Sequence, residues 1–586
     1  MPLVSKSEAL SEGDIRLKIS FEENRRAASG EILALGLLLV AATLVASAPA
    51  LLPGHNLVGH DILFHLNRIE GIKEGLLSGQ FPVRLDVNCI RGYGMPTGIF
   101  YPSLFVYVPA ILRIFGVSQM ASWKAFLVMV NFLTMVSSWW AFSKYLRSAR
   151  TGAIATLFYL VVGYRLIDVY ARAAAGEMLS MAFLPAVLLS IWMTLHRNVS
   201  YWPAVVLFMT GIFQSHIITG LVIVFTAVLL AAASYPRLRI AEVRWAVFKA
   251  AGMTFLLNIW FYAPLLYFHT HMDYVMKNLV KGSLDGFIRP LKSMDFYLGS
   301  AMLILLVIVV LLQVFRKRDR APWQFWLFVA LSAGIAGLTV FPALWRLLGK
   351  SAGVLQFPFR LAMFPAVLIP LALAMAFSKV RHLSIVTGLA FLCLCGNLFW
   401  LTGNTYRAIP SRFKMPAEQL QVPPGQPSPM FMLDPRDADI EPYMASGDLV
   451  YIDYADAAVD PGLHKENWLV RWKVLSNVRS LHPSDRITSV ERRGAEFVIT
   501  YSAGREEQLE LPLLWYMGYA AEIDGTPCPV LRDEDAQVSI HLPETAGTLH
   551  VWYAGLPWFR MTDAISFVSL LGFCIILYRT GKRSAL

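Results

Sequence analysis

Four ionisable side chains stand close together directly after the first long apolar segment of the chain. The stretch GHDILFHLNR (59–68) supplies His60 and three candidate residues, Asp61, His65 and Arg68. Ionisable residues at a membrane boundary are costly, and they tend to face a cavity or a partner. A carboxylate can accept a proton during a reaction, and an arginine can grip a phosphate through two parallel hydrogen bonds. These residues are therefore candidates for a reactive site.

Each of the three also has a purely structural explanation. Asp61 can cap a helix that begins beside it, because an acid is favoured at the positive end of the helix dipole. His65 follows one helical turn later and can satisfy that acid. Arg68 can be no more than a surface anchor. The sequence alone leaves these alternatives open.

Three later stretches carry similar residues beside apolar segments. They are YARAAAGEMLS (170–180), preceded by Asp168, then FQSHIITG (213–220) and LQFPFR (355–360). Arg172 and Glu177 can form a structural ion pair, and His216 can be a hydrogen-bonded core histidine. Arg360 begins a helix, where the dipole disfavours a cation, so a bound anion explains it better. We expect all these stretches to meet at one outer boundary of the membrane.

Together these residues suit an attack on an anionic lipid headgroup, such as a sugar carried by polyprenyl phosphate. Asp61 would accept the proton of a weakly nucleophilic acceptor hydroxyl. Arg172 and Arg360 would hold the phosphate and stabilise the charge that develops on it. The predicted catalytic group is Asp61, His65 and Glu177, of which the last two orient substrates or tune the acid. The predicted substrate-binding residues are Arg68, Asp168, Arg172, His216, Gln356 and Arg360.

The sequence indicates neither a cofactor nor a metal. A glycine-rich phosphate-binding loop is missing from the segments predicted to face the cytoplasm, which disfavours a soluble nucleotide sugar as the donor. A lone Asp61 with histidine and arginine neighbours argues against a bound divalent ion.

The composition indicates a membrane protein. Of the 586 residues, 56% are hydrophobic and only 16% are charged, which lies outside the range of soluble globular domains. The net charge of +11 comes from lysines and arginines in short runs between apolar segments, as expected for cytoplasmic loops. Nucleic acid is excluded as a partner, because its binding would gather these charges on one folded face. The five cysteines form no disulfide framework.

Twelve apolar segments are predicted to cross the bilayer. With both termini in the cytoplasm, every strongly basic loop falls on one side. The segment 101–116 contains Pro109 and Arg113, so we expect an interfacial helix there. ASAPA (46–50) could be a signal-peptidase site, but the long N-terminal tail with several glutamates favours an uncleaved anchor. The predicted spans are 32–52, 122–143, 151–164, 178–195, 202–216, 217–233, 245–263, 297–315, 323–341, 361–378, 383–401 and 564–578.

A polar block before the last span has the alternation of β-strands. AEFVITYS, AQVSIHLP and GTLHVWYAG each place their apolar residues on one face, and turn signals such as Asp524-Gly525 separate them. We expect an antiparallel β-sandwich outside the membrane. The predicted divisions are a cytoplasmic tail (1–30), a transmembrane domain (31–403) with a first outer loop (53–121), a β-rich domain (404–560), and a final helix with a basic tail (561–586).

An aspartate in the first outer loop, followed by juxtamembrane helices, resembles the layout of the GT-C class of membrane glycosyltransferases. GHDILFHLNRIEGIKEGLLSGQFPVRL, YARAAAGEMLSMAFLPAVLL, QSHIIT and QFPFR are similar to stretches of the bacterial YfhO-like membrane proteins. The resemblance implies a polyprenyl-phosphate-sugar donor, an inverting transfer and Asp61 as the acid–base residue. It names no acceptor, and GT-C enzymes differ in whether they use a divalent ion. Phe359 stands where the family pattern suggests tryptophan.

The predicted fold is thus an α-helical polytopic, GT-C-like membrane protein with an extracytoplasmic β-sandwich. We expect it in a bacterial cytoplasmic membrane, with the site facing outward. Its partners would be a polyprenyl-phosphate sugar and a glycan, lipid or protein acceptor of the cell envelope. The main alternative is a transporter or flippase of lipid-linked glycans, although no internal repeat supports it. An acyltransferase of cell-wall glycans and a structural assembly factor are further alternatives.

Overall fold

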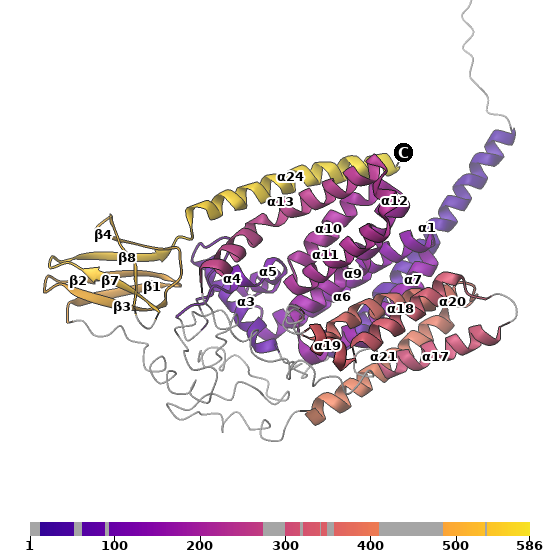
Figure 1. Cartoon of the computed structure of the whole chain (residues 1–586), viewed down its shortest axis with the longest axis horizontal. Helices are drawn as coiled ribbons and strands as arrows, with labels where there is room; N and C mark the ends of the chain where they lie inside the picture. The colour runs from indigo at the N-terminus through magenta and orange to yellow at the C-terminus, as the bar shows by residue number, and fades with distance from the viewer. Residues whose placement is uncertain are drawn as a thin grey trace, which may run out of the picture.

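The structure is a computed structural model of the whole chain, and it describes residues 12–51, 61–87, 89, 93–272, 299–316, 320–339, 341–348, 355, 357–408, 485–533 and 536–585. Most of the described chain is helical (Figure 1). The helices of the first half are α1 (Glu12–Ala46), α2 (Ala48–Leu51), α3 (Ile62–Leu77), α4 (Thr97–Phe100), η2 (Leu104–Val106), α5 (Tyr107–Ile114), α6 (Gln119–Leu146), α7 (Ala149–Leu160), α8 (Gly163–Ile167), η3 (Asp168–Arg172), α9 (Ala175–His196), η4 (Val199–Tyr201), α10 (Trp202–Phe213), α11 (Ile217–Ala233), α12 (Tyr235–Leu238) and α13 (Ala241–His271). The later helices are α17 (Ser300–Phe315), α18 (Trp323–Thr339), α19 (Pro342–Leu348), η7 (Pro358–Ala362), α20 (Met363–Phe377), α21 (Leu383–Ala408) and α24 (Pro557–Ala585).

The helices are those of a multi-pass membrane protein. Within the described ranges, 6 helices are long and apolar enough to cross a bilayer, or 7 if α7 and the bent continuation Gly163–Arg172 count as one span. A further set of shorter apolar helices includes α10, α11, α17 and α18. Every one of the twelve predicted segments falls on an apolar helix, while the number of crossings itself stays a prediction. In 101–116, the apolar helix covers only Leu104–Ile114, which is too short for a span.

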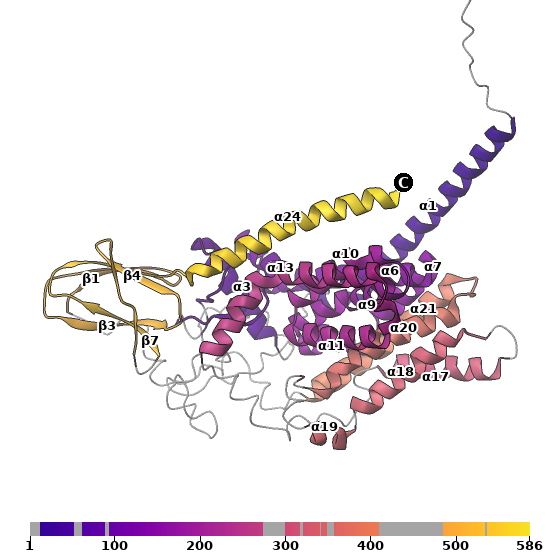
Figure 2. The same ribbon diagram turned by 45° about the horizontal axis from the view of Figure 1, so that its top comes forward.

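The basic loops that were predicted to be cytoplasmic meet at one end of the helix bundle. Arg150 donates hydrogen bonds to the carbonyls of Val380 (2.8 Å) and Arg381 (2.6 Å). Arg197 donates to the carbonyl of Lys144 at 3.0 Å. The β-rich domain and helices α3 to α5 lie at the opposite end from the C-terminus of α24 (Figures 1 and 2). The bundle therefore has a basic end and a second end that carries the β-rich domain.

The C-terminal region contains two antiparallel sheets, in the strand orders β1-β2-β8-β4-β5 and β3-β7-β6. Alternating apolar residues of both sheets form a shared core, in which Val538, Ile540, Leu549 and Val551 are fully buried. The alternation seen in the sequence is thus confirmed. At the predicted Asp524-Gly525 turn both residues have positive φ (48° and 77°), as a tight hairpin requires. The strands are β1 (Ile487–Arg493), β2 (Glu496–Tyr501), β3 (Glu507–Leu514), β4 (Tyr519–Ile523), β5 (Thr526–Cys528), β6 (Leu531–Arg532), β7 (Gln537–Leu542) and β8 (Gly547–Tyr553).

The β-rich domain packs directly against the loop that leads into α4. The N–H of Leu514 donates to the carbonyl of Tyr93 at 2.9 Å, and the Tyr516 hydroxyl donates to the carbonyl of Gly94 at 3.2 Å. An apolar cluster joins this loop to the ends of α13 and α24, through Phe268 and Phe559 among others. The domain therefore has a fixed position relative to the helices.

Two helices extend a few residues into the predicted range of the β-rich domain. Helix α21 continues to Ala408, past the predicted boundary at 404, and α24 begins at Pro557, ahead of the predicted 561. Proline is favoured at the first position of a helix because its missing N–H costs nothing there. Residues 409–484, most of the first half of the predicted domain, lie outside the described residues.

Candidate active site

An irregular stretch between α7 and α9 carries three of the predicted site residues. The axis bends by 47° between α7 and Gly163–Arg172, and Asp168–Arg172 form a π-helical turn. Ala173 then adopts a left-handed φ of 53°, which is uncommon for a residue with a side chain. Single π turns are rare and frequent at functional sites. This geometry turns Asp168 and Arg172 toward the first turn of α9, where Glu177 lies.

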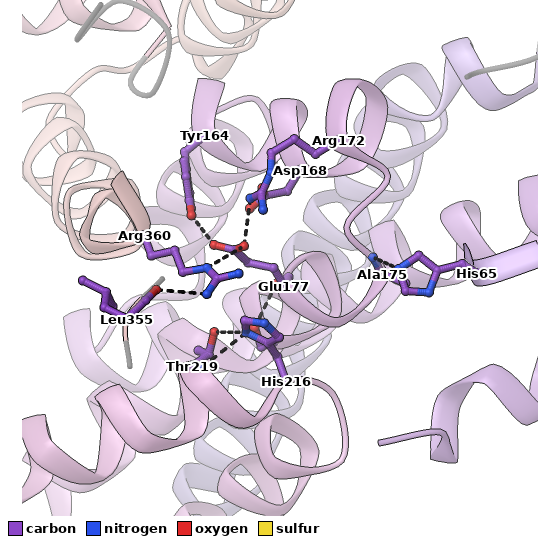
Figure 3. Close-up of polar contacts among 11 residues, drawn as sticks. His65, Tyr164, Asp168, Arg172, Ala175, Glu177, His216, Thr219, Leu355 and Arg360 are labelled. Atoms are coloured by element: carbon purple, nitrogen blue, oxygen red, sulfur yellow. Dashed lines mark hydrogen bonds and ion pairs between the residues drawn. The ribbon is translucent and has the colours of Figure 1, made fainter. Parts of the chain in front are cut away.

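Glu177 is the centre of a buried ion cluster (Figure 3). Its Oε2 accepts from Arg172 Nη1 at 2.8 Å and lies 3.4 Å from Arg360 Nε. The Tyr164 hydroxyl donates to Oε1, and Arg172 Nη1 also donates to Asp168 Oδ1 at 2.5 Å. The exposed fractions of the four charged side chains are 0% for Asp168, 4% for Glu177, 7% for Arg360 and 11% for Arg172. Two acids and two arginines thus neutralise each other away from water.

The negative charge beside Arg360 is Glu177, a residue of the protein itself. Arg360 lies in η7, directly ahead of α20, and its Nη1 donates to the carbonyl of Leu355 at 3.0 Å. The sequence explained this cation by a bound anion, whereas the structure supplies Glu177 as the negative charge. Gln356, the neighbouring predicted binding residue, lies outside the described residues.

Two stacked phenylalanines hold the arginines of the cluster from the η7 side. The rings of Phe357 and Phe359 stack at 5.0 Å. The Arg172 guanidinium lies 5.1 Å from the Phe359 ring, and that of Arg360 lies 5.4 Å from the Phe357 ring. Cation–π contacts of this kind favour the flat guanidinium over an ammonium. Phe359 therefore provides an aromatic contact to Arg172.

Asp61 lies next to this cluster through its backbone. It precedes α3 as the N-cap residue, and its N–H donates to the carbonyl of Arg172 at 2.9 Å. Its half-buried side chain makes no capping hydrogen bond to the first turn of α3. Asp61 thus stands at the helix start that the cap explanation requires, but its side chain does not bond the N–H groups of that turn. The carboxylate stands at the junction of α3 and the π turn.

His65 joins α3 to the start of α9 and contacts neither end of the ion cluster. Its Nε2 accepts from the N–H of Ala175 at 3.2 Å (Figure 3). Its Nδ1 lies 3.2 Å from Arg68 Nη1. The ring stacks on Trp123 at 5.9 Å. Burial, together with the charge of Arg68, lowers the pKa of His65 well below its ordinary value. A neutral ring that accepts from the Ala175 N–H and lies beside the Arg68 guanidinium acts as a positioning group.

Arg68 is a buried clamp rather than a surface anchor. Only 2% of the residue is exposed. Its Nη2 donates to the carbonyl of Pro102 at 2.7 Å and to Ser103 Oγ at 3.0 Å, and its guanidinium lies 4.4 Å from the Tyr101 ring. Arg68 therefore fixes the 101–103 segment against α3.

His216 caps α11, as the core-histidine alternative suggested. Its Nδ1 lies 2.8 Å from Thr219 Oγ1 and accepts from the N–H of the same residue at 3.3 Å. The ring also packs against Gly176, where a Cβ would lie 3.2 Å from His216 Cδ2. The histidine thus supports the turn that presents Glu177.

Sequence reasoning missed three polar residues of this region. Tyr164 and Tyr101 look like core aromatics in the sequence. Arg165 is fully buried and donates to Asn131 Oδ1 and, at 2.8 Å, to the carbonyl of Leu160. Asn131 in turn donates to the Tyr170 hydroxyl at 3.2 Å, so this network holds the π turn from behind. A charged residue inside an apolar segment was the available signal for Arg165.

Comparisons with known proteins find similarity to solved structures, three of which are described below. No family model matches the sequence, and no curated protein does. The arabinofuranosyltransferase AftD from mycobacteria is 14% identical with a TM-score of 0.39, over 64% of this chain and 26% of that chain. ArnT from Cupriavidus metallidurans, bound to undecaprenyl phosphate, is 15% identical with a TM-score of 0.29, over 67% of this chain and 81% of that chain. The Archaeoglobus fulgidus oligosaccharyltransferase in its apo form is 14% identical with a TM-score of 0.33, over 74% of this chain and 58% of that chain.

The chain thus spans about a quarter of AftD. At these TM-scores the similarity assigns no activity to it. Among the described residues, no group of three or more His, Cys, Asp or Glu side chains is arranged to hold a metal ion.

Proposed function

We propose that the chain is a membrane glycosyltransferase that moves a sugar from a polyprenyl-phosphate donor to an acceptor of the bacterial cell envelope. The transfer takes place on the outer side of the cytoplasmic membrane and inverts the anomeric centre. One observation carries the proposal. The N–H of Asp61 is bonded to the carbonyl of Arg172, so the backbone of the proposed base is joined to the turn that carries an arginine suited to phosphate.

Asp61 is the proposed general base. The acceptor hydroxyl attacks the anomeric carbon of the sugar and passes its proton to the Asp61 carboxylate. The bond from that carbon to the phosphate oxygen breaks, and its electron pair leaves with the polyprenyl phosphate. A carboxylate can assist in this way because it accepts the proton as the hydroxyl oxygen forms its new bond.

Arg172 is the proposed contact to the leaving phosphate. Its Nη1 is held by Asp168 and Glu177, while Nε and Nη2 make no hydrogen bond within the described chain. Its side chain is also the most exposed of the cluster, at 11%. A guanidinium already fixed on one side loses little freedom when it binds phosphate on the other. Arg360, held by Glu177, would supply a second positive charge.

The remaining predicted residues are proposed to position this pair. Glu177 and Asp168 orient Arg172, since both accept from its Nη1. His65 and His216 brace the two ends of the turn around Gly176. The acidic residues of the cluster thus serve the arginines rather than exchanging protons with the substrate.

The function is tested with the purified full-length chain and a panel of synthetic polyprenyl-phosphate sugars. Wild-type chain should release polyprenyl phosphate from one of these donors when envelope material is added as acceptor. Asp61→Asn should lower that release by about a hundredfold or more, as expected for loss of a general base, while donor binding persists. Asp485→Asn, which makes the same change at an exposed residue of the β-rich domain, should keep full activity.

Full activity in Asp61→Asn would overturn the assignment of the base. Movement of the lipid across a vesicle bilayer without sugar release would instead identify a flippase.

A further inference from the structure

Tyr101 lies between α4 and η2, and its ring is held by α3. The ring meets Phe64 edge-on at 5.7 Å and His65 edge-on at 6.1 Å. The Arg68 guanidinium lies 4.4 Å from the ring centroid, and the same arginine holds the following carbonyl of Pro102. These contacts leave the ring little freedom to rotate, so the direction of its hydroxyl is fixed.

The hydroxyl of Tyr101 points to the turn that carries Glu177. It lies 2.6 Å from the position that a Cβ on Gly176 would occupy, and the carbonyl oxygen of Ser215 lies 2.8 Å from the same position. Only glycine fits there, because any Cβ would collide with both oxygens. The absence of a side chain at Gly176 is what allows the hydroxyl to approach the start of α9.

The hydroxyl has no hydrogen-bond partner among the described residues, although the side chain is half-buried. A half-buried hydroxyl of this kind is available to a ligand. Four charged groups act on it, namely Arg68, Asp61, Arg360 and Glu177. The hydroxyl therefore lies near the proposed base, Asp61, and near two charges of the cluster, Arg360 and Glu177.

The state of the hydroxyl suits a donor. Burial raises the pKa of Tyr101 above its ordinary value, so the proton stays on the oxygen at neutral pH. The Arg68 cation over the ring draws electron density from it and strengthens the O–H as a donor. An O–H that donates to an anionic oxygen forms one of the stronger hydrogen bonds in proteins.

We propose that Tyr101 is a further substrate-binding residue, whose hydroxyl donates a hydrogen bond to the phosphate of the polyprenyl-phosphate donor. This inference rests on the proposed function. A phosphate oxygen held by Arg172 would occupy the space between the cluster and Asp61, within reach of the Tyr101 hydroxyl. Arg172 and Tyr101 would then hold the phosphate from two sides.

The test measures binding of two lipids to the purified full-length chain in detergent. Undecaprenyl phosphate, the lipid bound in the ArnT structure, is compared with undecaprenol, which has the same chain and no phosphate. Tyr101→Phe should weaken binding of the phosphate about tenfold, the usual loss for one hydrogen bond to a charged group, and leave undecaprenol binding unchanged. Tyr267→Phe removes a hydroxyl from α13 in the same way and should change neither.

A second variant approaches the same contact from the backbone side. Gly176→Ala places a methyl group where the hydroxyl lies, so it should also weaken phosphate binding selectively. Equal phosphate affinity of wild type and Tyr101→Phe would overturn the role of Tyr101 while leaving the proposed function intact. A wild-type chain that binds the alcohol as tightly as the phosphate would overturn both.

Discussion

Two groups of acidic and basic side chains in this molecule share the same chemistry but not the same surroundings. In the helix bundle, Glu177 pairs with Arg172 and Arg360, and none of these side chains is more than 11% exposed. On the outer face of the five-stranded sheet, His550 pairs with Glu496 at 2.7 Å and Glu522 at 3.4 Å, and these side chains are 30–38% exposed. Water screens the second group and not the first.

The difference indicates which of the two groups is tied to function. The sheet group follows from strand register, since His550 lies directly opposite Glu522, and an exposed pair of this kind contributes little to stability. The bundle group joins residues far apart in sequence and leaves a costly buried charge if one partner is lost. Such a cluster persists only where the fold or a ligand requires it, so we place function in the bundle.

The largest effect is expected from the centre of the buried cluster. Glu177→Gln leaves Arg172 and Arg360 buried with less negative charge, which should destabilise the protein by about 3 kcal/mol and abolish transfer. Thermal unfolding in detergent measures the first effect and donor turnover the second. Glu496→Gln is the matched change on the sheet and should stay within about 0.5 kcal/mol of wild type. Equal losses in the two variants would remove the distinction between the groups.

A somewhat smaller effect is expected when residue 172 keeps its positive charge but loses the planar guanidinium group. Arg172→Lys retains a cation but loses the planar fork and the contact with Phe359, so donor turnover should fall about a hundredfold. Arg492→Lys makes the same change beside Phe497 in the β-rich domain and should leave turnover unaltered. Normal turnover in Arg172→Lys would show that a point charge is sufficient.

The smallest effect concerns the acid sensitivity of His65. Its folded pKa is depressed, so below about pH 6.5 the unfolded chain takes up a proton that the folded chain does not. Stability should therefore fall with decreasing pH, by up to about 1.4 kcal/mol per unit from this residue. Melting temperatures between pH 7.5 and 5.5 should fall less steeply in His65→Gln. Identical slopes in wild type and His65→Gln would assign the sensitivity elsewhere.

The sequence predicted the elements better than it predicted the roles of single residues. Apolar length placed the helices, and alternation placed β7 and β8, because both depend on local pattern. The sequence also predicted that four stretches would lie close together, because they were expected at the same depth in the membrane. They are 61–68, 168–177, 216 and 360. The contacts of Arg68 and Arg360 within the protein could not be predicted, because their partners Pro102 and Glu177 come from other segments.

Some features had no signal in the sequence at all. Ala173 adopts a left-handed φ although alanine has no preference for it, because the surrounding network dictates the backbone there. Tertiary packing alone brings the Tyr164 hydroxyl to Glu177 and the Tyr101 hydroxyl to Gly176. A tyrosine next to an apolar run is most simply predicted as a core residue. Only the surroundings of its hydroxyl distinguish a core tyrosine from one in a polar site.

The docking of the β-rich domain has a mechanical consequence. Strand β8 ends at Tyr553 and α24 begins at Pro557, so little slack separates the domain from its last helix. On the other side, the domain is hydrogen-bonded to Tyr93 and Gly94. The short helix α4 separates these two residues from Tyr101. A load applied to the sheets, by an acceptor polymer that pulls on them for example, would travel along this short tether. Such a load would displace Tyr101, the proposed phosphate contact, before it displaced the rest of the helix bundle.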